Sequence, residues 1–464
     1  MSNTRAQWSG RLGFILAATG SAIGLGNLWK FPYITFENNG GAFVLVYLGA
    51  IAVVGAPIMV AEILLGRRSQ KNAVGAFRVL SKGKPGGGAW RGVGILGVTT
   101  GFVILSYYSV IAGWTLRYIL MAVSGELGDL AYHPEALESF FGGFLGNPLE
   151  QILYHCVFMG ATVGVVFFGV GKGIERAAMI LMPVLFAILV VLVVYSISTP
   201  GFRQALAFLF RPNFHELTTG SVLEALGHSF FTLSLGMGAM LTYGSYMRKR
   251  DSIPRAAVTI CALDTLIAIM ACVIMFSIIF SFDFEVTKSS SILFTTLPVV
   301  FFKLPGGHVI SALFYLLVSF AALSSTISLL EVVSSYAIDE FGWARRRATL
   351  TMGAAILAFG VLSAISLGGH AALSNINLIG RPSTAGVFGT LDYLASNWFL
   401  PVGGLLIALF TGWILTRDEC RQELEEGHGP MGWAYPAWRF LIKFAAPAAV
   451  GAIIVSVILG AEYQ

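Results

Sequence analysis

Charged residues are scarce in this chain. Only 11% of its 464 residues are Asp, Glu, Lys or Arg, whereas 56% are hydrophobic. A single soluble core cannot bury so much apolar surface, which excludes an ordinary soluble enzyme. The long apolar runs do not alternate, so they favour membrane-spanning helices, in which every backbone polar group is satisfied without water. We therefore predict an all-α integral membrane protein.

Cysteine is also rare, and the four positions show neither disulfide nor metal-binding spacing. The sequence contains no GxxxxGK[ST] motif, which argues against nucleotide-driven pumping. The first apolar run continues without a small-residue cleavage site, so we expect no cleavable signal peptide. The net charge of +5 does not indicate a nucleic-acid partner, because the basic residues lie between apolar segments, where membrane topology explains them.

Eleven apolar segments predict eleven transmembrane helices. They lie near residues 12–36, 41–65, 92–124, 151–170, 174–198, 218–247, 256–282, 309–338, 348–367, 386–416 and 435–461. Lys and Arg collect before the first segment and in alternate connections, which predicts a plasma (inner) membrane protein with a cytoplasmic N-terminus and an extracytoplasmic C-terminus. The loop at 283–308 is too apolar for a solvated linker and is expected to fold back over the outer opening. The polar stretch 417–432 is expected to be a cytoplasmic connector.

Two of the segments are interrupted by glycine and polar residues. The first contains GSAIGLGN at 20–27, and the sixth contains FTLSLGMGA at 231–239. Glycine in membrane helices often serves close packing, but a break in mid-membrane frees backbone groups that need partners. Because the two breaks occupy matched positions, we favour ion and substrate binding at them.

The matched breaks also predict the organisation of the chain. Helices one and six would each open a five-helix half, and an odd number makes the halves run in opposite directions, which is typical of inverted-repeat transporters. We predict a single transmembrane transporter domain over 1–464, with a first repeat at 1–198, a second inverted repeat at 217–416 and an additional helix at 433–464.

Five segments carry a resemblance to a known family. They are RLGFILAATGSAIGLGNLWKFPY, NNGGAFVLVYL, SYYSVIAGW, FFTLSLGMGAMLTYGSYM and FAALSSTISLLEVV. In this order they resemble the signature segments of the neurotransmitter:sodium symporter family, and specifically of its bacterial sodium-dependent amino-acid transporters. The resemblance covers helices one to ten, and many bacterial members also have eleven helices.

The resemblance implies two bound sodium ions. The first site is implied to consist of Ala22, Asn27, Thr232 and Asp264, together with the substrate carboxylate. The second is implied to consist of Gly20, Ile23, Ala321, Ser324 and Ser325. Carbonyl, hydroxyl and carboxamide oxygens suit a hard cation, although serine hydroxyls in membranes also bond to their own helix.

Asp264 is an isolated acid within an apolar run, at a cost of about 2.5 to 3.5 kcal/mol on the lenient insertion scale. It therefore needs a cation or a proton. In chloride-dependent animal members this position resembles an asparagine beside a bound chloride. A fixed carboxylate supplies that negative charge here, so we expect chloride-independent transport.

The family's substrate pocket maps onto a largely apolar set of residues. They are Ser21, Ala22, Leu25, Gly26, Ile104, Tyr108, Phe231, Thr232, Ser234, Met237, Ser325 and Leu329. Amine-transporting members resemble one another in carrying an aspartate where this chain has Gly24, so the resemblance implies an amino-acid substrate. An apolar pocket disfavours charged side chains, and a flexible Met237 between two glycines favours a broad choice of hydrophobic or aromatic L-amino acids.

The resemblance also implies gates on both sides of the site. Lys30 takes the place of a family arginine on the outer side, with Asp392 about one turn before the position expected for its acidic partner. Arg5 and Trp8 resemble a cytoplasmic latch whose partner is Asp339. Glu62 resembles an acid that supports the broken sixth helix. His228 and Glu331 have no assigned role at this stage.

We therefore expect a non-enzymatic, sodium-coupled symporter that imports hydrophobic or aromatic L-amino acids by alternating access, with sodium, the amino acid and the lipid bilayer as its partners. The alternative from another class is a membrane sensor that binds an amino acid without net transport. An ion channel is weaker still, because selectivity filters usually come from symmetric rings of subunits.

Overall fold

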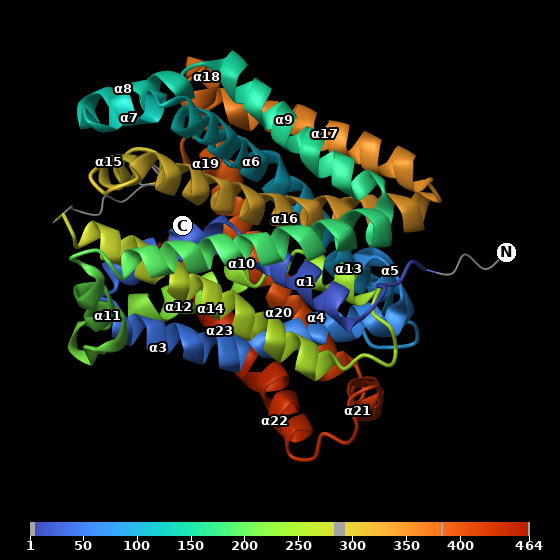
Figure 1. The fold of residues 1–464 in the computed structure, drawn as a ribbon. Helices are drawn as coiled ribbons and strands as arrows, with labels where there is room; N and C mark the ends of the chain where they lie inside the picture. The colour runs from blue at the N-terminus through green and yellow to red at the C-terminus, as the bar shows by residue number, and fades with distance from the viewer. Residues whose placement is uncertain (1–4, 283–292, 378, 382–383, 463–464) are drawn as a thin grey trace.

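The computed structural model describes residues 5–282, 293–377, 379–381 and 384–462 (Figure 1). All regular elements within these residues are helical. The longer α-helices are α1 (Arg11–Ala22), α3 (Gly41–Ala50), α4 (Ala56–Ser69), α6 (Arg91–Ser124), α8 (Pro134–Leu145), α9 (Pro148–Phe167), α10 (Arg176–Ser196), α12 (Thr219–Thr232), α14 (Ile253–Ile279), α16 (Gly307–Phe341), α17 (Arg345–Ile365), α20 (Leu400–Leu409) and α23 (Ala446–Ile458).

The shorter α-helices are α2 (Phe31–Glu37), α5 (Ala73–Leu80), α7 (Glu126–Ala131), α11 (Phe202–Phe210), α13 (Ala239–Gly244), α15 (Thr296–Phe302), α18 (Ala371–Ser374), α19 (Gly386–Leu394), α21 (Arg417–Glu425) and α22 (Ala434–Phe440). Wider or tighter turns join several of them, namely η1 (Gly26–Lys30), η2 (Ile51–Gly55), η3 (Gly87–Trp90), η4 (Val170–Glu175), η5 (Phe214–Glu216), η8 (Ala395–Phe399), η9 (Phe410–Ile414) and η10 (Leu441–Ala445).

Nine helices in the described residues are long and apolar enough to cross a membrane, and ten if the bent pair at the N-terminus counts as one span. The nine are 41–69, 87–124, 148–167, 170–196, 253–279, 307–341, 345–365, 386–414 and 434–458. The bent pair corresponds to the first predicted segment. The sixth predicted segment, 218–247, consists of α12 and α13 with a break between them, and neither piece is long enough to count by itself.

The first break follows α1. Ile23 has an extended backbone (φ −74°, ψ 115°), and the helix resumes at Gly26 with a bend of 54°. Two glycines allow other side chains to approach this turn. A Cβ atom at Gly24 would lie 2.8 Å from both the Ser325 and Tyr108 hydroxyls, and one at Gly26 would lie 3.1 Å from the Phe231 ring. The break therefore exposes backbone toward α6, α12 and α16.

The second break separates α12 from α13. Ser234, Gly236 and Gly238 all have positive φ angles, of 52°, 81° and 76°. The left-handed conformation suits glycine because it lacks a Cβ atom. At Gly236 space is limiting as well, since a Cβ atom there would lie 2.4 Å from the carbonyl oxygen of Leu400 in α20. The sequence LSLGMG thus breaks the helix where α20 packs against it.

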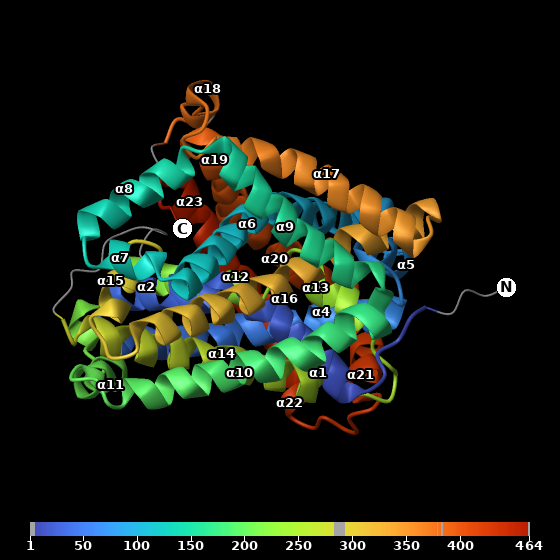
Figure 2. The same ribbon diagram turned by 45° about the horizontal axis from the view of Figure 1, so that its top comes forward.

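The remaining helices enclose the two breaks. α9 and α17 lie side by side at one edge of the molecule, and α21 and α22 project at the opposite edge (Figures 1 and 2). The connection at 125–150, which is rich in acidic residues, contains α7 and α8. In the predicted loop at 283–308, α15 packs against α16, whereas 283–292 lie outside the described residues, so the predicted fold-back is not tested there. The predicted polar connector contains α21, which begins with a capping box between Thr416 and Glu419.

Candidate functional site

The first predicted ion site is a buried cluster between the two breaks and α14. The Asn27 side-chain amide donates to Asp264 Oδ1 at 2.7 Å and to Thr232 Oγ1 at 2.9 Å. The Thr232 hydroxyl lies 3.1 and 3.2 Å from the two carboxylate oxygens of Asp264. All three side chains are at most 1% exposed. Tyr47 adds its hydroxyl at 3.5 Å from Asp264 Oδ2. Three of the four predicted residues therefore meet through their side chains, and Ala22 lies buried at the end of α1.

The second predicted ion site lies where the first break meets α16. The Ser325 hydroxyl donates to the carbonyl of Ile23 at 3.1 Å and to that of Ala321 at 3.3 Å. The Ser324 hydroxyl donates to the Ala321 carbonyl at 2.8 Å. A Cβ atom on Gly20 would lie 3.1 Å from Ser324 Cβ, so the fifth predicted residue is adjacent. Ser325 thus bonds both to its own helix and across to the break.

Oxygen atoms dominate both clusters. The described residues hold no group of three or more His, Cys, Asp or Glu side chains placed for a metal ion. The donors that converge are backbone carbonyls, hydroxyls, one carboxamide and one carboxylate, which is the chemistry that hard cations prefer. A buried carboxylate in this setting also requires a compensating positive charge or proton.

Beside these clusters lies a small cavity of about 30 Å³. It is lined by Ser21, Ala22, Gly24, Gly26, Ile104, Tyr108, Phe231, Thr232, Ser234, Met237, Ser325 and Leu329. Every predicted substrate residue except Leu25 is in this lining, and Gly24 is the residue that the sequence did not place there. The Leu25 amide donates to the Tyr108 hydroxyl at 3.0 Å. The volume is close to that of one water molecule, so the walls must move apart to admit a larger ligand.

A second cavity of about 500 Å³, here called the Lys30 hollow, lies on the other side of Phe231 and Tyr108. Both side chains line the two cavities and so divide them. The Lys30 Nζ atom lies 4.7 Å from the centre of the Phe231 ring, a cation–π contact. Asp392, the predicted partner of Lys30, lines the same hollow. Lys30, the only Lys or Arg among the described residues that line this hollow, therefore lies over the aromatic ring that covers the small cavity.

The opposite end of the molecule has a cavity of about 990 Å³, here called the Arg5 hollow, at the predicted latch. Arg5 Nη1 lies 2.5 Å from Asp339 Oδ2, and both side chains are at most 15% exposed. The Trp8 indole is fully buried and donates to the Tyr243 carbonyl at 3.0 Å. The guanidinium of Arg5 also lies over the ring of Tyr246, 4.7 Å from its centre. The three predicted latch residues therefore fasten the N-terminus to the end of α13 and to α16.

A second charged layer lies beside this latch, and sequence reasoning missed it. Glu331 is fully buried in α16 and forms a two-pronged ion pair with Arg345 at the start of α17, in which Nη2 and Oε1 are 2.9 Å apart. The Tyr246 hydroxyl donates to Glu331 at 2.5 Å. Arg345 belongs to the basic connections that predict the topology, and the sequence indicates no other role for it. The available signal was Glu331 itself, since an acid in an apolar run needs a partner.

Two further polar residues, Glu62 and His228, are buried near the breaks. Glu62 in α4 accepts hydrogen bonds from the backbone amides of Gly236 at 2.7 Å and Leu241 at 3.3 Å, as the resemblance implies. His228 is buried in α12, and its ring stacks on Phe31 at 5.5 Å between centres. Glu62 therefore satisfies amides that the second break frees.

Comparisons with known proteins agree with this arrangement. The sequence pattern described as "Sodium:neurotransmitter symporter family" matches residues 5–131 and 144–463. The chain is 37% identical over 452 residues to "Uncharacterized sodium-dependent transporter YhdH" of Bacillus subtilis, covering 97% of each protein. It is 26% identical over 506 residues to the "Sodium-dependent serotonin transporter" of Drosophila melanogaster, covering 98% of this chain and 77% of that one.

A solved structure has a similar fold. The "Crystal structure of MhsT in complex with L-phenylalanine" superposes with a TM-score of 0.87 and is 42% identical, covering 97% of this chain and 99% of that one. This similarity shows that the two proteins share a helical fold. The matched relatives named above are transporters.

Proposed function

Because the chain belongs to the sodium:neurotransmitter symporter family, we propose that it is a sodium-coupled symporter that imports hydrophobic or aromatic L-amino acids by alternating access. It is a sodium-dependent transporter of a multi-pass membrane family with the LeuT fold. The observation that carries the proposal is the meeting of Asn27, Thr232 and Asp264 at the two helix breaks.

We propose two sodium ions. The first is held by Ala22, Asn27, Thr232 and Asp264, and the second by oxygen atoms of Gly20, Ile23, Ala321, Ser324 and Ser325. The distances in both clusters support this assignment, because hydroxyl, carboxylate and carbonyl oxygens already converge there, with the Asn27 amide group beside them. Binding sodium at both breaks would fix the backbone that surrounds the small cavity.

We propose that the small cavity is the substrate site. Ile104, Phe231, Met237 and Leu329 give it an apolar wall, and no charged side chain lines it, so a charged substrate side chain would lose hydration without gaining a partner. Gly24 leaves no acid there to meet an amine that lacks a carboxylate. The related MhsT binds L-phenylalanine, which agrees with an aromatic or aliphatic substrate.

We further propose that transport is independent of chloride. The Asp264 carboxylate provides a negative charge beside the first sodium site when sodium is bound there, and its neighbours Asn27, Thr232 and Tyr47 are neutral. An added anion at that position would be repelled by the carboxylate rather than required.

The proposed topology has eleven transmembrane helices in a single domain, with two inverted five-helix repeats at 1–198 and 217–416 and a last helix at 433–464. α12 and α13 together provide the sixth span. With a cytoplasmic N-terminus, the Arg5 hollow faces the cytoplasm and the Lys30 hollow faces outward. Phe231 and Tyr108, with Lys30, then form the outer gate, and Arg5, Trp8 and Asp339 form the inner one.

Equilibrium binding of labelled L-phenylalanine at varied sodium concentration tests the site. Binding by the unaltered chain should require sodium. The variants Asn27→Ala and Thr232→Ala should need much more sodium for the same occupancy, because each removes an oxygen from the first ion site. Wild-type sodium dependence in both variants would contradict the assignment. Sodium-dependent binding without accumulation in vesicles would favour the sensor.

A further inference from the structure

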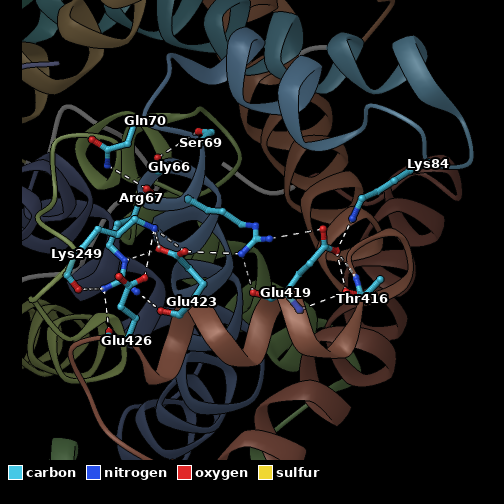
Figure 3. Close-up of polar contacts among 11 residues, drawn as sticks. Gly66, Arg67, Ser69, Gln70, Lys84, Lys249, Thr416, Glu419, Glu423 and Glu426 are labelled. Atoms are coloured by element: carbon cyan, nitrogen blue, oxygen red, sulfur yellow. Dashed lines mark hydrogen bonds and ion pairs between the residues drawn. The ribbon is translucent and has the colours of Figure 1, made fainter. Parts of the chain in front are cut away.

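A buried ion pair joins the end of α4 to α21 (Figure 3), close to the Arg5 hollow, whose lining includes Ser69 and Gln70 just after Arg67. The Arg67 side chain is fully buried and that of Glu423 is 3% exposed, with 2.7 Å between Nε and Oε1. Burial of two charges is unfavourable unless their remaining donors and acceptors are also satisfied. Here these donors and acceptors are satisfied. Arg67, Glu423 and the residues bonded to them are here called the joint.

Arg67 binds two separate stretches of backbone. Its Nη1 donates to the carbonyls of Asp251 at 2.6 Å and Glu426 at 3.2 Å, and its Nη2 donates to the carbonyl of Glu423. The Glu423 and Glu426 carbonyls lie at the C-terminal end of α21, where a cation is favourable. Asp251 lies in the turn between α13 and α14. One side chain thus ties together the end of α4, this turn and the end of α21.

Two lysines strengthen the same joint. The Lys249 Nζ atom lies 2.7 Å from Glu423 Oε2, so Glu423 has cations on two sides. Lys84, from the connection before α6, forms an ion pair with Glu419 one turn earlier on α21. Arg68 adds a pair with Glu419 at 3.6 Å. Figure 3 shows α21 lying with its acidic face toward these basic side chains.

Close backbone contacts fix the positions of the helices that meet at the joint. A Cβ atom on Gly66 in α4 would lie 2.0 Å from the carbonyl oxygen of Leu241 in α13. A Cβ atom on Gly427, just after α21, would lie 2.6 Å from the Arg250 carbonyl group. Ser252 at the start of α14 is hydrogen-bonded to His428 at 2.6 Å. These contacts make α4, α13 and α21 one tightly packed unit at this end of the molecule.

We propose that Arg67 is a positioning residue that makes α21 move as one body with α4 and α13 during transport. Glu62, on the same helix as Arg67, holds the second break, and α20, which leads into α21, packs against that break at Gly236. Fixing α21 to α4 therefore fixes where α20 meets the break. The inference rests on the proposed transport function but on no particular substrate.

The first test compares Arg67→Lys and Glu423→Gln with a matched control, Arg421→Gln. Arg421 forms an exposed pair with Glu425 on the same helix. Lysine lacks the planar set of donors with which Arg67 reaches two backbone segments and Glu423 at once. We expect both joint variants to lose about tenfold in the maximal uptake rate while their equilibrium affinity for phenylalanine changes by less than about twofold. The control should keep both values.

Two results of this test would overturn the proposal. One is a wild-type uptake rate in folded Arg67→Lys protein. The other is a loss of affinity and melting temperature in parallel with uptake, which would reduce the role of Arg67 to folding. Failure of the unaltered chain to accumulate substrate would instead contradict the proposed function.

Spin-label distances test the joint without altering Arg67. Labels on Arg421→Cys and Arg250→Cys report on the joint, and labels on Arg421→Cys and Arg347→Cys report on α21 against α17. Cys156 is replaced by Ser, because the other three native cysteines are buried. On adding sodium and phenylalanine, the first distance should stay constant and the second should change. A change in the first, or no change in the second, would overturn the proposal.

Discussion

The two ends of the proposed substrate path are closed in different ways. At the Lys30 hollow, closure depends on Phe231 and Tyr108, with one lysine stacked on the Phe231 ring. At the Arg5 hollow, closure depends on two ion pairs, Arg5 with Asp339 and Arg345 with Glu331. The aromatic closure can open by side-chain rotation, whereas the charged closure requires several bonds to break together.

This difference indicates which of the two closures opens more easily. A cation–π contact contributes about 0.5 to 2 kcal/mol, whereas removing one partner of a buried ion pair costs about 3 to 5 kcal/mol. Tyr246 also links the two charged layers, since Arg5 stacks on its ring and its hydroxyl binds Glu331. The structure therefore represents a state closed firmly at the Arg5 hollow and lightly at the Lys30 hollow.

The largest effect is expected from Glu331→Gln, which leaves Arg345 without its buried counter-charge. The charged closure should weaken by about 3 to 5 kcal/mol. A cysteine placed at Ser335, which lines the Arg5 hollow, should then be alkylated much faster. The matched control is Glu340→Gln, since its partner Arg78 is 45% exposed. Equal alkylation in the two variants would contradict the proposed second layer.

A smaller effect is expected from Asp339→Asn, which removes the charge that faces Arg5. Hydrogen bonds to charged groups contribute about 1.5 to 3 kcal/mol, and the second layer stays in place. Alkylation of the same cysteine should rise, but less than in Glu331→Gln. The reverse order of the two variants would show that the latch, and not Glu331, is the principal closure.

At the Lys30 hollow, Lys30→Met removes the cation but keeps an apolar side chain of similar length. The expected loss of about 0.5 to 2 kcal/mol corresponds to about 2- to 30-fold faster release of bound phenylalanine. Lys30→Arg is the control, since it preserves the cation over the ring. Release measured by dilution should be fast only in the methionine variant, and an unchanged rate there would exclude Lys30 from the gate.

The smallest effect concerns Glu419, which belongs to neither closure. Partial burial raises the pKa of this carboxyl, but hydrogen bonds from Lys84 and Thr416 outweigh it, so its pKa lies below the usual range. Because the pKa of Glu419 is lower in the folded state than in the unfolded state, its ionisation stabilises the fold at a pH above the unfolded-state pKa. This stabilisation is lost as the pH falls through the folded-state pKa. Glu419→Gln should therefore be less stable than the wild type by about 0.5 kcal/mol at pH 7, which would be measured as a slightly lower melting temperature. The two melting temperatures should converge below about pH 4.

The helix breaks could be predicted from the sequence because their cause is local. Glycines and polar residues in GSAIGLGN and FTLSLGMGA weaken the helix wherever the chain folds. The substrate lining followed from the family resemblance, with Gly24 in place of Leu25. Leu25 differs because the bend at Ile23 turns it toward the Lys30 hollow.

The charged joints could not be predicted, because they depend on distant partners. Arg67 reads as one of several basic residues in a connection, and its burial follows only from the return of α21 more than 300 residues later. The same holds for Arg345, whose role depends on its packing against Glu331 and Tyr246. Basic residues that mark topology and those that hold helices together look alike in sequence.

Accumulation of labelled L-phenylalanine in proteoliposomes tests the central claim most directly, with gluconate replacing chloride throughout. An inward sodium gradient should raise the phenylalanine concentration inside the vesicles above that outside, and an equal potassium gradient should not. Uptake that is absent in gluconate and appears when chloride is restored, or that proceeds equally with potassium, would contradict a sodium-coupled symporter with Asp264 as its built-in anion.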